Sequence, residues 1–316
     1  MSEKIPNGPL VSIILPTYNR AYFIDKAIIS ILNQTYKNFE LIVVDDCSTD
    51  NTRDIIEKYL RADNRVRYIR NDKNLGPAGA RNIGIESAIG EFIAFQDDDD
   101  EWFPYKLEKQ VDLLCSLPET FAIVYSGFYK IVGREKNYIP SRSIHPREGN
   151  IHDSLLKGNF VDTPSVLVRK SALLNVGFFD ENLPMLEDWE LAIRLSKRYQ
   201  FKLIDEPLFI SHDTPNSVNK QSGAKFAGTL EYIIEKYIDD FSKNKEALGD
   251  IYFSCGKAYI MDGKRDVGLR CLFSAIKSMP LNLKYLITLL VSLFGTSVFN
   301  KLLYIKRKYI GPTRKR

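Results

Sequence analysis

The sequence predicts an α/β protein whose mostly parallel sheet is flanked by helices, followed by an all-α C-terminal region. Short apolar runs alternate with amphipathic segments over the first 95 residues. Acidic and polar side chains directly follow three of those runs. After residue 215 the spacing of apolar residues becomes helical. We therefore predict one domain over residues 1–215 and a helical domain over 216–316.

The first domain begins with an apolar run, "LVSIIL", which predicts a buried strand ended by Pro16. The next segment has apolar residues at helical spacing, namely Phe23, Ala27, Ile28, Ile31 and Leu32. The pattern then continues as strand, helix, strand, helix and strand at 40–46, 52–61, 65–71, 76–90 and 91–96. Such alternation predicts parallel strands with helices on both faces of the sheet.

The middle of the chain is less regular. "FAIVYSGFYKIV", residues 121–132, predicts one or two strands. A strand, a helix and a second helix that begins at "LEDWE" follow, and "FKLIDEPLFISH" predicts a last strand. In the helical domain, residues 251–282 fit either a single tetratricopeptide-like hairpin or an ordinary helical hairpin.

The composition is that of a soluble globular protein with no tendency toward nucleic acid. The 316 residues are 44% hydrophobic and 27% charged, and the net charge is only +4. The four cysteines have no metal-like spacing, which favours a reduced, cytoplasmic chain. The N-terminus has no apolar core typical of a signal peptide.

Three predicted strands end in polar segments, "PTYNR", "DDCSTD" and "QDDDD". Ligands of parallel α/β sheets bind beyond the carboxyl ends of the strands, so we expect these segments to meet at one crevice. Carboxylate oxygens suit Mg²⁺ or Mn²⁺, and Mg²⁺ is often shared with a substrate phosphate. The tetra-aspartate therefore predicts a cation that holds a phosphate.

The same edge has groups suited to a nucleotide. Asp46 could accept hydrogen bonds from a base or a ribose, and Tyr18 could stack on a base. Arg20 or Arg81 could contact phosphates. "GPAGARNIG" has neither the Rossmann glycine spacing nor the Gly-Lys of a P-loop, which disfavours a dehydrogenase or a P-loop ATPase.

Four ordered blocks, "VSIILPTYNR", "ELIVVDDCSTDNT", "NLGPAGARNIGIESAIGEFIAFQDDDDEWFPYKLEKQ" and "LEDWELAIRL", resemble family 2 glycosyltransferases of the GT-A fold. The resemblance covers roughly residues 10–215. It implies an inverting transfer of sugar from a nucleotide-diphosphate sugar, with a UDP-sugar the best match. The acceptor would be a hydroxyl of a glycan or of a lipid-linked molecule, as in polysaccharide biosynthesis.

The resemblance also implies roles for single residues. The nucleotide would lie against Pro16, Thr17, Tyr18, Asn19, Arg20, Asp46, Arg81, Asp97 and Asp98. Asp99, with Asp97, would bind the metal, and His212 would lie near the metal and the diphosphate. The register of the acidic motif stays open, because Asp98 and Asp100 form an alternative pair.

The "LEDWE" block matches the position of the family's catalytic base, which implies that Asp188 is the base. On a helix, Glu187 and Glu190 share a face, and Asp188 points elsewhere. We therefore expect Asp188 to face the site and the two glutamates to face solvent.

Two other functions stay open at this stage. A nucleotidyltransferase also uses paired acids and a metal, although the chain lacks a glycine- and lysine-rich nucleotidyl loop near its start. A catalytically inactive binding or scaffold protein is the second alternative. The intact acids in all four blocks argue against it.

The segment "YLITLLVSLFGTSVF", residues 285–299, is almost entirely apolar but shorter than the roughly 20 residues of a spanning helix. The last twelve residues, "IKRKYIGPTRKR", carry six basic side chains and no acid. The apolar segment fits either a helix buried in the helical domain or an in-plane helix at the inner membrane face. The second reading predicts peripheral membrane contact.

Overall fold

The computed structural model of the protein describes residues 8–214, 222–296, 299 and 301. The chain divides into two compact units. The sheet-bearing unit comprises residues 8–152, 160–183 and 187–214. The helical unit comprises 153–159, 184–186 and the described residues from 222 onward.

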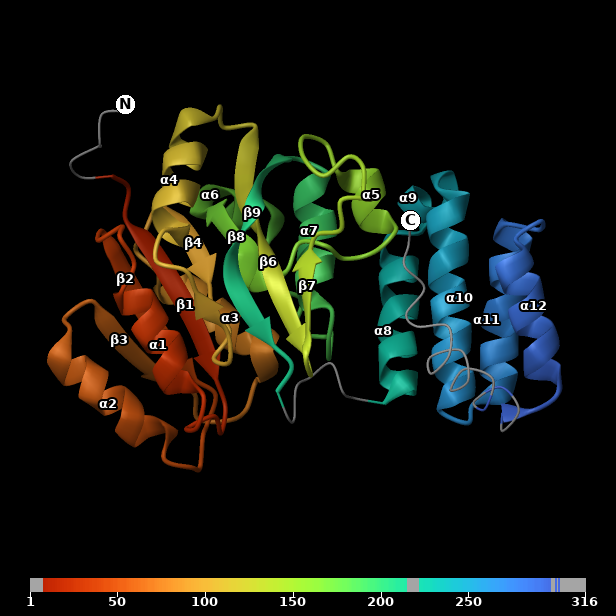
Figure 1. The fold of residues 1–316 in the computed structure, drawn as a ribbon, viewed down its shortest axis with the longest axis horizontal. Helices are drawn as coiled ribbons and strands as arrows, with labels where there is room; N and C mark the ends of the chain where they lie inside the picture. The colour runs from red at the N-terminus through yellow and green to blue at the C-terminus, as the bar shows by residue number, and fades with distance from the viewer. Residues whose placement is uncertain (1–7, 215–221, 297–298, 300, 302–316) are drawn as a thin grey trace. The chain divides into compact units, whose positions relative to one another are not determined.

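The predicted alternation of strands and helices is confirmed over the first 95 residues (Figure 1). The elements are β1 (Val11–Thr17), α1 (Ile24–Leu32), β2 (Phe39–Asp45), α2 (Thr52–Ala62), β3 (Val66–Arg70), α3 (Gly76–Ser87) and β4 (Phe92–Phe95). β1 pairs in parallel with β2 and β4, and β2 pairs in parallel with β3. All three strand ends predicted to hold ligands therefore point to the same edge of the sheet.

One predicted boundary in this half is wrong, because β1 continues through Pro16 to Thr17. The backbone of Pro16 faces the side of β4, and β4 ends at Phe95, beside Ile14. The missing N–H of Pro16 therefore removes no ladder hydrogen bond.

The second half of the unit makes the sheet mixed. Its elements are β5 (Glu101–Trp102), α4 (Lys106–Ser116), β6 (Phe121–Val132), β7 (Glu135–Ile139), α5 (His152–Leu156), the 3-10 helix η1 (Thr163–Ser165), β8 (Val166–Arg169), α6 (Lys170–Val176), α7 (Glu187–Ser196) and β9 (Gln200–His212). The strand order is β3-β2-β1-β4-β8-β6-β9-β5, and β7 pairs with β6. β8 is antiparallel to both β4 and β6, so its first residues lie at the edge where the parallel strands end.

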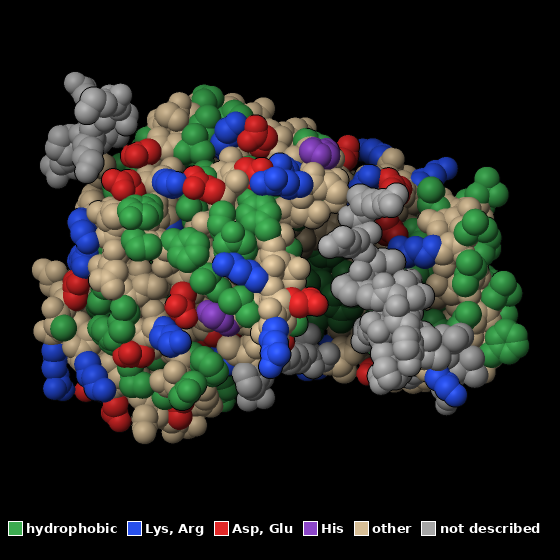
Figure 2. Space-filling model, in the orientation of Figure 1, with side chains coloured by type: hydrophobic (Ala, Val, Ile, Leu, Met, Phe, Trp, Pro, Cys, Tyr) green, Lys and Arg blue, Asp and Glu red, His purple; other side chains and the backbone are tan. Residues whose placement is uncertain are grey.

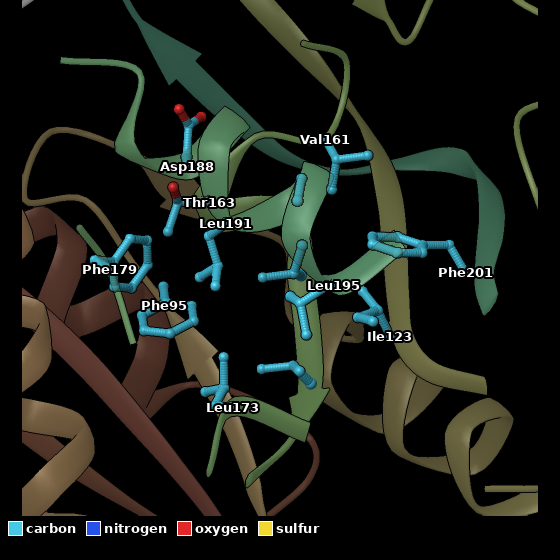
Figure 3. Close-up of a pocket in the computed structure, with 13 residues that line it drawn as sticks. Phe95, Ile123, Val161, Thr163, Leu173, Phe179, Asp188, Leu191, Leu195 and Phe201 are labelled. Atoms are coloured by element: carbon cyan, nitrogen blue, oxygen red, sulfur yellow. The ribbon is translucent and has the colours of Figure 1, made fainter. Parts of the chain in front are cut away.

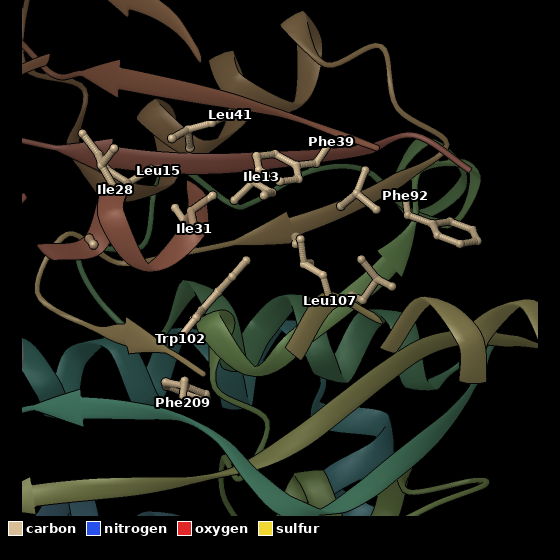
Figure 4. Packing of buried hydrophobic residues seen from close by; sticks show 14 of the residues in the cluster. Ile13, Leu15, Ile28, Ile31, Phe39, Leu41, Phe92, Trp102, Leu107 and Phe209 are labelled. Carbon is tan, nitrogen blue, oxygen red and sulfur yellow. The ribbon is translucent and has the colours of Figure 1, made fainter. Parts of the chain in front are cut away.

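The core of the unit fills the space between the sheet and the helices α1 and α4. Figure 4 shows Ile13 and Leu15 of β1 and Leu41 of β2 close to Ile28 and Ile31 of α1. Each fully buried side chain of this size contributes roughly 1.5–3 kcal/mol. This core lies directly beneath the strands whose ends form the acidic edge.

The helical unit contains α8 (Gly223–Lys236), α9 (Ile238–Lys243), α10 (Lys245–Met261), α11 (Arg265–Ser278) and α12 (Leu283–Leu293). α10 and α11 form a hairpin that turns at Gly263, whose φ is 82°. The two helices approach closely where glycines meet, since a Cβ at Gly256 would lie 2.9 Å from the carbonyl oxygen of Gly268. A hairpin was predicted over residues 251–282; it is present, but its first helix begins six residues earlier, at Lys245.

α12 has one buried side and one exposed side. Tyr285 is fully buried and stacks on Phe253 with ring centroids 4.9 Å apart. The opposite side exposes apolar residues, which Figure 2 shows as green over α12; they are Leu283, Ile287, Leu290, Leu293 and Phe294. No helix in the described part of the chain is long and apolar enough to cross a membrane. The C-terminal segment 305–316, whose six basic side chains were part of the membrane prediction, lies outside the described residues.

Candidate active site

The loops after β1 and β2 are tied together by Asn19. Its side-chain Oδ1 accepts a hydrogen bond of 2.7 Å from the backbone N–H of Thr49, and its own N–H donates to Ser48 Oγ at 2.9 Å. Asn19 and Cys47 have φ angles of 53° and 70°, in the left-handed region. Backbone in this region concentrates at functional sites, so the two loops are candidates for a ligand-binding site.

The tetra-aspartate joins the same edge through Thr17 and Arg20. Thr17 Oγ1 donates to Asp98 Oδ2 at 2.8 Å, and Arg20 Nε donates to Asp98 Oδ1 at 3.0 Å. A second guanidinium nitrogen of Arg20 contacts Asp99. The segments that follow β1, β2 and β4 thus lie side by side.

Asp46 is buried and holds a loop. Its carboxylate accepts hydrogen bonds from the backbone N–H groups of Leu75 and Gly76, both at 2.8 Å, and from Asn71 Nδ2 at 2.9 Å. Asp46 therefore fixes the loop that leads into α3. Tyr18, by contrast, exposes 46% of its surface and presents a ring to solvent at this edge.

Arg81 of α3 links the tetra-aspartate to the "LEDWE" block. It donates to Asp97 Oδ1 at 2.8 Å and to Glu187 Oε1 at 2.7 Å. Burial lowers the pKa of Arg81, but the charges of Asp97 and Glu187 raise it by more. Arg81 thus stays charged between two acids that lie far apart in the sequence.

The expectation that Glu187 and Glu190 face solvent is wrong. Glu187 is 8% exposed and Glu190 is fully buried. Arginines neutralise both, because Arg81 pairs with Glu187 and Arg194 Nη2 lies 2.8 Å from Glu190 Oε2. Asp188, between them, is the acid of the three that stays partly exposed.

Asp188 lies in the first turn of α7, at one end of an apolar cavity (Figure 3). Leu191 and Leu195 of the same helix line that cavity together with Phe95 and Phe201. Partial burial raises the pKa of Asp188 to about 8, and the charges of Asp162 and Glu187 add to the rise. A carboxyl group tuned in this way suits proton transfer near neutral pH.

Asp162 is a site residue that the sequence analysis missed. It directly precedes η1, and burial together with the charge of Asp97 raises its pKa to about 6. Asp162 reaches the ligand edge because β8 runs antiparallel to β4, so the chain enters β8 from that edge. The signal in the sequence was an acid and a Thr-Pro pair just before an apolar run, "VDTPSVLV".

The predicted metal ligands Asp97, Asp99 and His212 are not gathered into one ligand set. Asp97 pairs with Arg81, and Asp99 contacts Arg20 and accepts a hydrogen bond from Thr214 Oγ1. His212 Nε2 lies 3.2 Å from Glu101 Oε1. Over the described residues, no three His, Cys, Asp or Glu side chains form a group that could hold a metal by themselves.

The chemistry of the acids nevertheless fits a cation that is shared with a ligand. Burial raises the pKa of Asp98 to about 7, with the charge of Asp99 adding to the rise. Burial and the charge of Asp97 likewise raise the pKa of Asp99. Excess negative charge favours a divalent ion, and Mg²⁺ commonly needs only one or two protein carboxylates when phosphates supply the rest.

The fold and this acidic edge define a GT-A-type α/β protein with an added helical unit. The chain belongs to glycosyltransferase family 2, since the family model "Glycosyl transferase family 2" matches residues 12–177. This match includes the tetra-aspartate and ends before the "LEDWE" block.

Two curated relatives show the range of the similarity. TuaG of Bacillus subtilis (strain 168), named provisionally as a teichuronic acid biosynthesis glycosyltransferase, is 36% identical over 51% of this chain and 62% of its own length. WfgD of Escherichia coli, named as a UDP-Glc:alpha-D-GlcNAc-diphosphoundecaprenol beta-1,3-glucosyltransferase, is 38% identical over 52% of this chain and 62% of its own length. The chain thus spans less than two thirds of each of these relatives.

Two solved structures share the fold at low identity. S. aureus TarS 1-349 in complex with UDP-GlcNAc has a TM-score of 0.66 and 19% identity, over 96% of this chain and 93% of that one. The mannosyltransferase PcManGT from Pyrobaculum calidifontis, in complex with GDP-Man and Mn2+, has a TM-score of 0.60 and 17% identity, over 97% and 89%. At these identities the similarity establishes the fold alone.

Proposed function

We propose that the protein transfers a sugar from a nucleotide-diphosphate sugar to a hydroxyl of a glycan or lipid-linked acceptor, with inversion at the anomeric carbon. The observation that supports this most strongly is the position of Asp188. It is a partly exposed carboxyl whose neighbour Glu187 is tied through Arg81 to the acidic strand ends. The proposed transferase domain is residues 1–215, with residues 216–316 as the helical domain.

UDP is the proposed nucleotide of the donor. The name of WfgD includes a UDP-sugar and TarS was solved with one, although PcManGT binds GDP-Man. The exposed ring of Tyr18 would stack on the base, and the loop held by Asp46 would border the nucleoside. Asp98, hydrogen-bonded to Thr17 next to Pro16, would lie near the ribose.

The proposed cofactor is Mg²⁺ or Mn²⁺, held by Asp99 and Asp97 together with the diphosphate of the donor. When bound, such an ion would offset the charge that develops on the leaving diphosphate. Arg20 contacts Asp99, and the N–H of His212 donates to the adjacent Asp100, so both residues would lie near the diphosphate.

The chemical step follows from the position of the base. The acceptor oxygen attacks the anomeric carbon, and the bond from that carbon to the diphosphate oxygen breaks, with its electron pair leaving on the diphosphate. The acceptor proton passes to the Asp188 carboxylate. The apolar cavity behind Asp188 keeps its affinity for the proton high.

We also propose a cytoplasmic protein that contacts the inner membrane face through the exposed apolar side of α12. The support is the row of exposed side chains that includes Ile287 and Leu290. The sequence adds basic residues after this helix, which would attract anionic lipid headgroups. WfgD, by its name, acts on a diphosphoundecaprenol substrate, which is lipid-linked.

A donor screen followed by product analysis tests the proposed function. Thermal shift with Mn²⁺ would identify the nucleotide sugar that stabilises the protein, and its slow hydrolysis would then be followed. Release of nucleoside diphosphate and free sugar supports the transferase. In a parallel reaction with a nucleoside triphosphate and a sugar 1-phosphate, release of pyrophosphate would show a nucleotidyltransferase. Failure of every donor to bind would favour a scaffold, and either result overturns the proposal.

A further inference from the structure

A groove of about 440 Å³ lies on the sheet-bearing unit, apart from the acids described above. We call it the β6–β9 groove, and its lining residues are Tyr129, Tyr138, Ser141, Arg142, Asp205, Glu206 and Pro207. Its volume is within the range of small-molecule sites, roughly 300–1,000 Å³. None of the roles assigned above uses these residues.

A local irregularity in β9 lies at the groove. β6 and β9 pair at Ser126 and Ile204 and again at Gly127 and Pro207, so Asp205 and Glu206 are extra residues on β9. Between Ser126 and Tyr129 the chain advances three residues on β6 and six on β9. Bulges bend a strand, re-aim side chains and are common next to functional sites.

Two tyrosines form one wall of the groove in a fixed arrangement. The rings of Tyr129 and Tyr138 meet edge to face, with centroids 6.2 Å apart and an interplanar angle of 73°. Tyr138 lies over Gly127, where an added Cβ would be only 2.1 Å from the phenol oxygen. The same hydroxyl donates to Asp205 Oδ1 at 2.7 Å. The ring is thus held by packing and by a hydrogen bond.

The charges around the groove leave a positive excess. Both acids are already neutralised, since Arg147 bonds Asp205 through two nitrogens at 3.0 Å and Lys109 Nζ lies 2.6 Å from Glu206. Arg142 is close enough for its charge to lower the pKa of Asp205, as Arg147 does more strongly, but among the described residues it has no hydrogen bond or ion pair of its own. Lys136 Nζ, 3.8 Å from the ring centroid of Tyr129, adds a second cation without a carboxylate partner in the described structure.

We infer that the β6–β9 groove binds an acidic saccharide unit of the acceptor glycan. The two tyrosine rings offer apolar surface to the C–H groups of a sugar ring, except on the face of Tyr129 that Lys136 covers. An arginine beside it offers paired N–H donors to a carboxylate of that sugar. The inference rests on the proposed function, because it assigns the groove to the acceptor of that reaction.

The position of the groove along β9 supports an acceptor subsite. β9 runs from Pro207 in the groove to His212, whose N–H donates to Asp100 Oδ1 at 3.2 Å. Five residues of extended strand span about 17 Å. A glycan bound in the groove would therefore reach the acidic edge within a few sugar units.

The test is saturation-transfer NMR on the full-length protein with two matched probes at millimolar concentration, methyl β-glucuronide and methyl β-glucoside. We expect the glucuronide to bind better than the glucoside. Arg142→Gln should weaken the glucuronide by about tenfold, the cost of a charge-assisted hydrogen bond, and leave the glucoside unchanged. Tyr129→Ala should weaken both probes. Arg134→Gln, in the exposed turn between β6 and β7, is the matched control and should change neither.

Donor hydrolysis by the same variants separates this inference from the proposed function. Arg142→Gln and Tyr129→Ala should hydrolyse the donor at the wild-type rate, which also shows that they are folded. Equal binding of the two probes, or glucuronide binding that Arg142→Gln leaves unchanged, would overturn the groove assignment even if hydrolysis is normal. If the wild type does not hydrolyse the donor but binds the two probes as expected, the proposed function is contradicted and the groove assignment is not.

Discussion

In the sheet-bearing unit, charged side chains are buried at the acidic edge; in the helical unit, apolar side chains are exposed on α12. Arg81 and Asp98 are 5% and 8% exposed, whereas Leu283 is 70% and Phe294 is 76% exposed. The two regions thus depart from ordinary burial in opposite directions.

The difference between the regions lies in what compensates each departure. The buried charges are paired with one another, as in the bridge from Asp97 through Arg81 to Glu187. Nothing in the described helical unit covers the outer side of α12 in a comparable way. Under the proposed function, a ligand would complete the acidic edge and a membrane surface would cover the outer side of α12. Departures from local rules of this kind are expected at functional sites.

The largest effect is expected for the proposed base. Asp188→Asn should lower transfer by about 10²–10⁴-fold, the usual contribution of a general base, with donor affinity nearly unchanged. Steady-state kinetics and donor titration check both quantities. Asp54→Asn, an exposed carboxyl on α2, is the control and should behave like the wild type. Near-normal turnover by the Asp188→Asn variant would show that Asp188 is not the catalytic base.

Breaking the buried bridge should reduce stability strongly. Arg81→Met leaves Asp97 and Glu187 without their shared cation and should lower the free energy of unfolding by about 3–5 kcal/mol. Arg53→Met removes the exposed pair with Glu57 and should change it by less than about 0.5 kcal/mol. Urea denaturation measures both values. Similar losses in the two variants would contradict the distinction between buried and exposed charges.

Asp99 and Asp46 should affect the binding of different parts of the nucleotide, the diphosphate and the nucleoside. Asp99→Ala should weaken UDP in the presence of Mn²⁺ by at least the roughly tenfold that loss of even an outer-shell metal partner costs. Asp46→Ala should weaken uridine as well as UDP, with or without Mn²⁺, because its loop loses three hydrogen bonds. Calorimetry with Mn²⁺ and with chelator checks this. Unchanged metal dependence in Asp99→Ala would move the metal role to another aspartate.

A smaller effect is expected on the exposed face of α12. Replacing Ile287 and Leu290 together by Gln should weaken binding to anionic vesicles by about tenfold or more, since burying one such side chain is worth roughly 1.5–3 kcal/mol. Leu174→Gln, at an exposed apolar position on α6, should have no effect. Co-sedimentation measures the bound fraction. If the wild type stays in the supernatant at low salt, α12 does not contact membranes.

The same carboxyl should also give a pH-dependent gain in stability when it is replaced. The pKa of Asp188 is about 8 in the folded protein and about 3.9 in an unfolded chain. Between these values the folded state holds the extra proton, so the wild type loses stability as pH rises toward 8. The amide introduced by Asp188→Asn cannot titrate, so the melting temperature of this variant should match the wild type near pH 4 and exceed it increasingly as the pH rises to 8. A constant difference across this range would show that Asp188 is not desolvated.

The parallel half of the fold was predictable because it is encoded locally. Up to Phe95, the spacing of apolar residues within each segment indicates a strand or a helix. Parallel pairing then brings the three strand ends to one edge of the sheet. The convergence of Asn19, Thr17 and Asp98 follows from that edge.

The rest of the site depends on contacts that sequence spacing does not encode. Asp162 reaches the edge only because β8 is antiparallel, and Glu187 is buried only because Arg81 of α3 meets it. Helical spacing shows that Glu187 and Glu190 share a face, but it does not show whether that face contacts solvent or arginines. The mixed exposure of α12 is likewise tertiary, since Tyr285 is buried on the same helix that exposes Leu290.

The most direct test of the central claim is the configuration of the sugar first released by hydrolysis of the donor. With Asp188 as base, water takes the place of the acceptor hydroxyl in one displacement. Time-resolved proton NMR with an α-linked UDP-sugar and Mn²⁺ should therefore show the β-anomer first, before mutarotation. Asp188→Asn should slow its appearance by at least about 10²-fold. Initial release of the α-anomer, or β-anomer release at an equal rate in Asp188→Asn, would contradict a single displacement driven by this carboxylate.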